Sequence, residues 1–289
     1  MSASTLPARR IPWAALRNLP WLPLLVLGAV GIAAIGGEAI SPHDPNGLDL
    51  SASFKPPAWQ DGGSWDYPLG ADNLGRDILS RIMAGCGVSV IVAFYAILFS
   101  GSIGALAGMI AGYFGGRVDA VLMRLIEIQQ SVPSIALALI LAAAMEPGLS
   151  TVVIVIVLTY WAWYARIIRG EIMALKGRDY IAFARTAGVS TPVIFRRHLL
   201  PNIFNTLVVL GTLQVGQVIL FEASLSFLGL GIQPPYPSWG SIMSVGRQYV
   251  ERAWWLTVFP GACLFVLVLC VNLFGDWLRD RVDPRSQGR

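Results

Sequence analysis

The side chains that could do chemistry are few and lie far apart in this sequence. Two histidines, His43 and His198, and three cysteines, Cys86, Cys263 and Cys270, are spread over 289 residues. Neither set has the spacing of a metal site or of a nucleophile with its base. No G-x-x-x-x-G-K-[ST] segment offers a cradle for the phosphates of ATP. The sequence therefore predicts a non-catalytic chain that binds no metal or cofactor of its own.

Polar side chains within apolar stretches are the next candidates, because an intramembrane carboxylate or amide is costly and usually faces a cavity or pore. Glu127, near Gln129 and Gln130, can instead pair with Arg124 on the same helix face. Gln214 and Gln217 either line a translocation path or hydrogen-bond a neighbouring helix. For Glu222 we predict a pore mouth or a surface facing an outside partner, with snorkelling to the interface as the alternative.

One polar group precedes the second long apolar stretch. Asp72, Asn73, Arg76 and Asp77 combine charges with neighbouring glycines. They predict a contact surface for another protein. The alternative is a solvated turn with a local Asp–Arg pair, which contributes little stability.

Three glycines four residues apart, Gly104, Gly108 and Gly112, follow within that stretch. Small residues at this spacing let helix backbones approach closely in lipid. They predict either an interface between subunits or packing inside this chain's own bundle.

The elements that carry these residues are mostly apolar. Hydrophobic residues make up 55% of the chain and charged residues 13%, with a mean hydropathy of +0.62. A soluble domain carries about 25% charged residues, so we predict an all-α integral membrane protein. Six uncharged stretches approach the length of a membrane helix and predict six transmembrane helices: Asn18–Gly37, Ile82–Gly116, Ile128–Met145, Pro147–Ala165, Leu199–Phe221 and Ala253–Gly275. A seventh, Ala223–Gly246, is rich in Gly and Pro and predicts an outer loop, partly re-entrant.

Charge gives this bundle an orientation. Lys and Arg dominate residues 166–202, whereas Asp dominates residues 41–85. Because basic loops remain in the cytoplasm, the first segment is predicted to be cytoplasmic and the second external. Arginines flank the first and last stretches and place both termini in the cytoplasm. A membrane flank explains the basic segment better than binding to nucleic acid.

These assignments divide the chain into consecutive parts. They are a cytoplasmic segment 1–18, a first transmembrane helix 19–40, an external loop 41–85, a core of five helices 86–276 that contains the loop 166–202, and a cytoplasmic tail 277–289.

The loop 166–202 is the most informative segment. Its apolar pattern predicts a helix from Gly170 to Ala187, ended by Gly188 in the left-handed conformation. Ser190 and Pro192 are typical of the start of a second helix, which runs to Leu200. Loops of this length are usually functional, so we predict a partner protein. An ordinary solvated surface loop is the alternative.

Four stretches, in the same order along the chain, resemble the motifs of one family. Tyr180–Ser190 with Ile194–Asn202 is similar to the EAA loop of ABC importer permeases. Three further stretches resemble the C-type permease subunit of dipeptide and oligopeptide importers: Tyr67–Arg81, Glu222–Pro235 with Trp239-Gly240, and Trp254–Gly261 through Asn272–Asp280 with Asp283–Arg285.

The resemblance implies a type I ABC importer permease fold in a bacterial inner (plasma) membrane. It makes the loop a coupling element that docks on an ATPase through Ala182, Phe183, Ala184, Arg185, Gly188, Val189 and Ser190. Where the family usually has the Glu of the EAA triplet this chain has Ala182, and Phe183 replaces the first Ala. The departure removes a charged contact but leaves the helix–Gly–helix shape.

The same resemblance implies partners and a solute. The partners are a second permease in a heterodimer, one or two cytoplasmic ABC ATPases that use ATP and Mg²⁺, and an external solute-binding protein. Asp72, Asn73, Arg76 and Asp77 would contact the binding protein or the second permease. The implied solute is a di- or oligopeptide, with nickel, glutathione or another small solute as alternatives.

Two other functions are alternatives to this one. A stand-alone channel or secondary transporter should show paired carboxylates or broken helices in matched halves, and the sequence has no inverted repeat. An intramembrane enzyme would need a nucleophile–base pair that the sequence does not offer.

Overall fold

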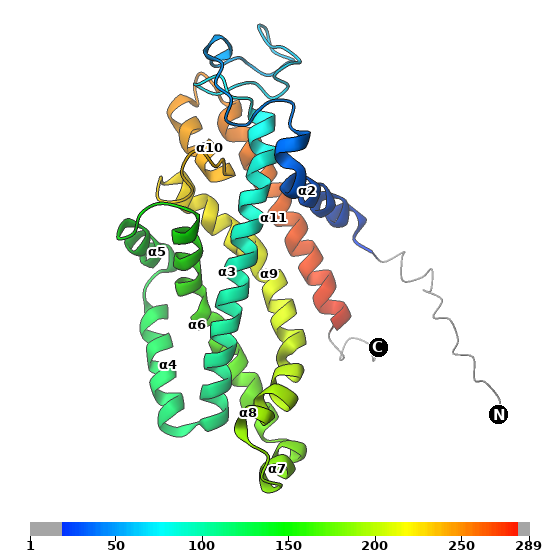
Figure 1. Cartoon of the computed structure of the whole chain (residues 1–289), viewed down its shortest axis with the longest axis vertical. Coiled ribbons are helices and arrows are strands. Elements are labelled where there is room, and N and C mark those ends of the chain that lie inside the picture. The colour runs from blue at the N-terminus through cyan, green and yellow to red at the C-terminus, as the bar shows by residue number, and fades with distance from the viewer. Residues whose placement is uncertain (1–18, 283–289) are drawn as a thin grey trace, which may run out of the picture.

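The computed structural model describes residues 19–282, which form a bundle of long helices (Figure 1). The long helices are α2 (Trp21–Ile40), α3 (Ile78–Phe114), α6 (Leu149–Lys176), α9 (Leu200–Phe227) and α11 (Trp255–Val282). The shorter elements are α4 (Gly116–Ser131), α5 (Ser134–Ala143), α7 (Asp179–Thr186), α8 (Thr191–Ile194), α10 (Trp239–Gly246) and the short turns η1 (Leu50–Ala52), η2 (Phe195–Leu199) and η3 (Arg247–Tyr249). Within the described residues the backbone forms no strand, only one isolated bridge between Ala71 and Asp77. The predicted all-α class is confirmed.

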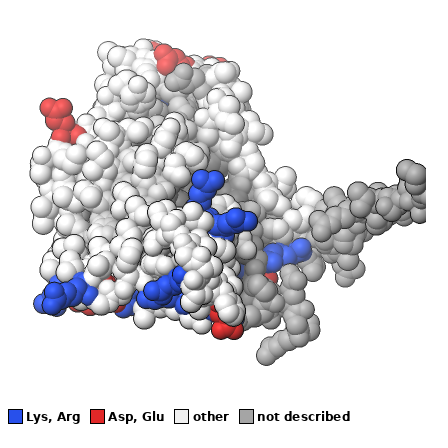
Figure 2. Space-filling model, turned by 60° about the horizontal axis from the view of Figure 1, so that its bottom comes forward, with Lys and Arg blue, Asp and Glu red and all other residues white. Residues whose placement is uncertain are grey.

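The two segments of opposite charge lie at opposite ends of this bundle. α7 and α8 form one end, whereas the loop between α2 and α3 lies at the other end together with α10 (Figure 1). Lys and Arg side chains gather on the end that carries α7 (Figure 2). The cytoplasmic position of residues 1–18 lies outside the described part of the chain.

Four helices are long and apolar enough to cross a membrane by themselves. They are α3, α6, α11 and the continuous helical run Thr191–Phe227, which contains α9. α4 and α5 together make a fifth span, bent by 87° at their junction. The apolar part of α2, Trp21–Gly37, is shorter, so its crossing, and with it the count of six, stays a prediction.

The stretch Ile128–Met145 is not the single straight helix that its composition predicts. The helix is interrupted between Ser131 and Ser134, where Val132 is extended with φ −90° and ψ 130°. Pro133 explains the break, because proline lacks an N–H donor and disfavours helical geometry in the residue before it.

The boundaries in the loop 166–202 also differ from the prediction of one helix over Gly170–Ala187. α6 continues out of the apolar stretch to Lys176 and ends at Gly177, so only α7 is a separate helix. The second predicted helix starts at Thr191 but does not end at Leu200, since α8, η2 and α9 form one run. Arg166 ended the uncharged stretch Pro147–Ala165 without ending the helix.

Two further boundaries move at the opposite end. α3 begins at Ile78, so the loop there ends at Asp77 rather than at Gly85. α9 extends to Phe227, and α10 folds within the Gly- and Pro-rich stretch Ala223–Gly246. α10 packs against both α9 and α11, whereas re-entry of this stretch into the membrane stays a prediction.

Candidate functional site

α7 presents an apolar side chain at the tip of the bundle end that the sequence predicts to be cytoplasmic. Phe183 is 71% exposed. Ala182 and Arg185 are also exposed, and Ala184 is half-buried. An exposed large aromatic residue outside the apolar stretches has no lipid to cover it, and such residues mark interaction surfaces.

The turn after α7 has the geometry that the sequence predicted. Gly188 has φ +73°, the left-handed conformation that favours glycine. Its N–H donates to the Arg185 carbonyl at 3.1 Å, and the Val189 N–H donates to the Ala184 carbonyl at 3.0 Å. This pair of bonds is the Schellman motif that ends many helices. Ser190 precedes the next helix, although its side chain makes no capping bond.

The inner face of α7 is fastened to three long helices. Ile181 is fully buried in a cluster with Ile168 and Ile172 of α6, Ile203 of α9 and Met109 of α3. The Arg185 guanidinium lies over the Tyr113 ring of α3, 5.6 Å from its centroid. A force applied to the exposed face of α7 therefore acts directly on α3, α6 and α9.

Two polar contacts at this end were not predicted from the sequence. Arg169 of α6 forms a two-pronged ion pair with Asp119 of α4, and its Nη2 donates to Oδ2 at 2.6 Å. Thr206 of α9 donates to Glu171 of α6 at 3.0 Å. Asp119, Arg169 and Glu171 lie in charged flanks that the sequence predicts to be cytoplasmic. The pairing of these residues could not be predicted from local spacing, because the partners are 35 and 50 residues apart in sequence.

The predicted path residues occupy three different environments. Gln214 is buried and Gln217 is exposed, so they do not present a common surface. Glu222 is fully buried at the outer end of α9 and accepts hydrogen bonds from serines. A solvent-facing pore mouth at Glu222 is therefore wrong in this conformation, and so is snorkelling. Arg124 and Glu127 form the predicted exposed ion pair, with Nη1 and Oε2 3.6 Å apart.

The break between α4 and α5 exposes polar groups that were not in the predicted path. Gln130 and the four residues 131–134 are all exposed. Gln129 is held differently, because its Nε2 donates to the carbonyls of Leu158 at 2.6 Å and Thr159 at 3.0 Å on α6. Irregular backbone at membrane depth is tolerated where it lines a water-filled cavity or is covered by protein. Pro133 and the polar run Gln129–Ser131 are the signals that could have found it.

The outer polar group is built mainly into the fold. Asp72 is buried and accepts from the backbone N–H groups of Leu74 and Arg76 and from Arg76 Nε, the last at 2.6 Å. Asp77 is buried and caps α3 by accepting from the Ser80 N–H at 2.9 Å. Their carboxylates thus shape the loop, and only Asn73 and Arg76 are partly exposed to a partner.

The same loop raises the pKa of one tyrosine and lowers that of its partner. Burial, followed by a hydrogen bond to Asp49, raises the pKa of Tyr67. Hydrogen bonds from the Ser51 and Tyr67 side chains lower the pKa of Asp49. The Tyr67 hydroxyl donates to Asp49 Oδ2 at 3.0 Å, which ties two parts of the loop together.

The glycine stripe packs inside the chain. A Cβ on Gly104 would lie 2.5 Å from the Trp161 carbonyl oxygen, and one on Gly108 would lie 2.6 Å from that of Ala165. A Cβ on Gly112 would lie 2.9 Å from the Arg169 oxygen. All three glycines therefore let α3 approach the α6 backbone, which decides for packing within the bundle over a subunit interface.

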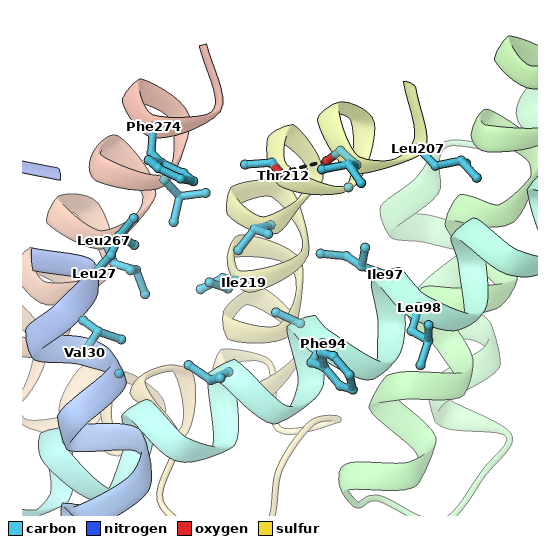
Figure 3. A pocket seen from close by; sticks show the side chains of 17 residues that line it. Leu27, Val30, Phe94, Ile97, Leu98, Leu207, Thr212, Ile219, Leu267 and Phe274 are labelled. Atoms are coloured by element: carbon cyan, nitrogen blue, oxygen red, sulfur yellow. Dashed lines mark hydrogen bonds between the residues drawn. The ribbon is translucent and has the colours of Figure 1, made fainter. Parts of the chain in front are cut away.

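An apolar groove of about 600 Å³ runs between α2, α3, α9 and α11 (Figure 3). Val30, Phe94, Ile219 and Leu267 lie around it, one from each helix. Thr212 carries the one hydroxyl among its lining residues, and that hydroxyl donates to the Val208 carbonyl at 2.9 Å. The residues that line the groove include no charged side chain that could bind the charges of a polar solute.

The structure combines a helical membrane bundle with a helix–Gly–helix element at one end. One face of that element packs on the bundle and the other face is exposed. This is the architecture of a transporter's membrane subunit that is moved by a protein outside the bilayer. The chain belongs to the family of binding-protein-dependent transport system inner membrane components, whose pattern matches residues 104–287. It is an ABC importer permease of the inner membrane.

Relatives cover most of the chain. The di/tripeptide transport system permease protein DppC of Pseudomonas aeruginosa (strain UCBPP-PA14) is 37% identical over 262 residues, covering 91% of this chain and 86% of the relative. The probable D,D-dipeptide transport system permease protein DdpC of Escherichia coli (strain K12) is 36% identical over 281 residues, covering 94% and 92%.

The fold is similar to that of a solved importer. The inward-facing MetNI methionine ABC transporter matches with a TM-score of 0.55 and 19% identity, covering 70% of this chain and 96% of the matched chain. The likeness supports the type I ABC importer permease fold.

Proposed function

We propose that this chain is the pore subunit of an ATP-driven importer of di- or oligopeptides. The support is its 36–38% identity, over 85% or more of its length, to permeases of peptide transport systems. In this role the chain itself catalyses no reaction. It forms a heterodimer with a second permease, receives solute from an external binding protein and is moved by one or two ATPases that bind ATP and Mg²⁺.

The observation that carries this proposal is the exposed face of α7. Phe183 projects from a helix whose other face is locked to α3, α6 and α9 through Ile181. An ATPase that holds Phe183 and Arg185 in a cleft can therefore turn its own closure into movement of the spans. Ala182 takes away the family's usual carboxylate, so the contact relies on shape and apolar area.

Replacing the exposed aromatic residue with a charge tests this contact. Phe183→Asp should lower co-purification of the co-expressed ATPase by about tenfold or more, because a central interface aromatic contributes about 2 kcal/mol. Leu48→Asp is the matched control, since Leu48 is 68% exposed at the opposite end. Undiminished co-purification with Phe183→Asp would remove α7 as the docking surface.

We assign the solute path to the α4–α5 junction and not to the apolar groove. Gln130, Ser131 and Ser134 offer hydrogen-bonding side chains there, and the broken helix leaves backbone carbonyls without helical partners. Peptides carry many such groups and need a polar wall. Gln217 adds an exposed amide on α9.

The orientation follows from the same proposal. Arg178→Cys, placed in a chain lacking Cys86, Cys263 and Cys270, should react with an impermeant thiol reagent only when the cytoplasmic face is opened. Trp65→Cys is the control, because Trp65 is 78% exposed in the external loop and should react in intact cells. Reaction of position 178 from outside intact cells would reverse the topology.

A further inference from the structure

Glu222 is a carboxylate that solvent does not reach, with an exposed fraction of 0%. Its Oε1 accepts from Ser226 Oγ at 2.7 Å, and its Oε2 accepts from Ser89 Oγ of α3 at 3.4 Å. Ser238, the N-cap residue of α10, adds a third hydroxyl. The ion pairs formed among residues 19–282 do not include Glu222. Serine hydroxyls from α3, α9 and α10 alone therefore offset the cost of burying it.

α10 packs closely against α3 and α9. The Trp239 Nε1 donates to the Ile82 carbonyl of α3 at 2.9 Å. A Cβ on Gly240 would lie 2.3 Å from the Ala223 carbonyl oxygen of α9. α10 lies at the outer end of the bundle beside the upper part of α3 (Figure 1). Glu222 is thus the polar centre of a tight junction between α10 and the two helices beneath it.

The helix that carries Glu222 runs without interruption from the cytoplasmic end. Thr191–Phe227 forms one helical run of 37 residues, which is about 55 Å long at about 1.5 Å per residue. It begins three residues after Gly188, at the end of the turn that follows α7. A displacement imposed on α7 therefore reaches the outer end through a single helix.

We infer that Glu222 is a positioning residue that makes α10 and the outer end of α9 move as one body. Movement of α7 by the ATPase then shifts α10 at the outer opening of the path, so opening and closing are linked across the membrane. This inference rests on the proposed function, in which ATP hydrolysis in partner subunits acts on α7. Without the hydrogen bonds of Glu222, only the packing contacts of Trp239 and Gly240 would hold α10 on these helices, and α10 would follow α9 less closely.

Transport per ATP hydrolysed, measured on the whole complex in liposomes, tests the inference. Glu222→Leu removes the acceptors at similar volume and should lower this ratio by about tenfold, while ATP hydrolysis continues. Glu222→Gln keeps the shape and one carbonyl acceptor and should restore most of the ratio. Ser238→Ala should resemble Glu222→Leu, and the two changes together should cost no more than either alone.

Ser241→Ala is the matched control for Ser238→Ala. Ser238 and Ser241 form the reciprocal capping box of α10, so both variants weaken the cap, but only Ser238 contacts Glu222. Equal losses from Ser238→Ala and Ser241→Ala would show a capping effect and overturn the inference. An unchanged ratio in Glu222→Leu and Ser238→Ala would overturn it as well.

A distance measurement separates this inference from the proposed function. Spin labels at position 224 of α9 and position 244 of α10, in a complex whose permeases lack native cysteines, should keep one distance with and without trapped ATP. The distance should change on trapping only in Glu222→Leu or Ser238→Ala. A change in the otherwise unaltered chain would disprove the one-body movement, whereas failure of Phe183→Asp to release the ATPase would disprove the coupling at α7 instead.

Discussion

Gly188→Val is expected to abolish solute uptake while the chain remains in the membrane at normal abundance. Gly188 holds φ +73°, where a residue with a Cβ costs about 1–2 kcal/mol and a β-branched residue more. A Cβ at this position would meet no atom within 4 Å, so the penalty comes from the backbone alone. The turn would relax, and Phe183 would lose the orientation that the Schellman bonds give it.

The rank order of substitutions at position 188 distinguishes backbone conformation from side-chain bulk. Asn tolerates the left-handed region better than other residues with a Cβ, so Gly188→Asn should retain the most uptake, followed by Gly188→Ala and then by Gly188→Val. Uptake into cells and immunoblots of membrane fractions give the two quantities. If Gly188→Val transports at the original rate, or if Asn and Val are equally damaging, the turn does not transmit the movement.

Local patterns were the part of this molecule that the sequence could predict. The end of α7 depends on residues that are neighbours in sequence, and Gly188 was enough to predict it. The class of protein followed from apolar content, and the two charged ends followed from the distribution of Arg and Asp. Each inference needed a window of residues but no knowledge of what packs against it.

Features that depend on distant partners could not be predicted in this way. Glu222 was predicted to lie at a pore mouth or on a surface facing an outside partner because it follows the end of an apolar stretch, yet its partner Ser89 lies 133 residues away. The Asp119–Arg169 pair is invisible for the same reason. The break at Pro133 is a different failure, since the proline was visible but the run of uncharged residues around it favoured a continuous span.

The glycine stripe shows what local spacing can predict and what it cannot. Its spacing predicted close helix approach, but the approaching helix is α6 of the same chain, as the 2.5 Å and 2.6 Å separations at Gly104 and Gly108 show. Gly101 lies in the same helix, outside the stripe, and differs from Gly104 and Gly108 in the space around it. A Cβ on Gly101 would lie 3.8 Å from the nearest atom, in the Tyr164 ring, which is ordinary van der Waals contact.

Gly104→Ala and Gly108→Ala are therefore expected to destabilise the bundle, whereas Gly101→Ala is expected to leave it unchanged or to stabilise it. A methyl group forced against the α6 backbone must push two long helices apart, and overpacking of this kind costs about 1–3 kcal/mol. Alanine also gains up to about 1 kcal/mol over glycine in a helix. At Gly101 that gain is unopposed, whereas at Gly104 and Gly108 it only reduces the loss. Thermal unfolding of the purified chain in detergent measures the difference, which should appear as a lower midpoint for positions 104 and 108. Equal midpoints for all three variants would mean that α3 and α6 are not in backbone contact and that the stripe faces a different partner.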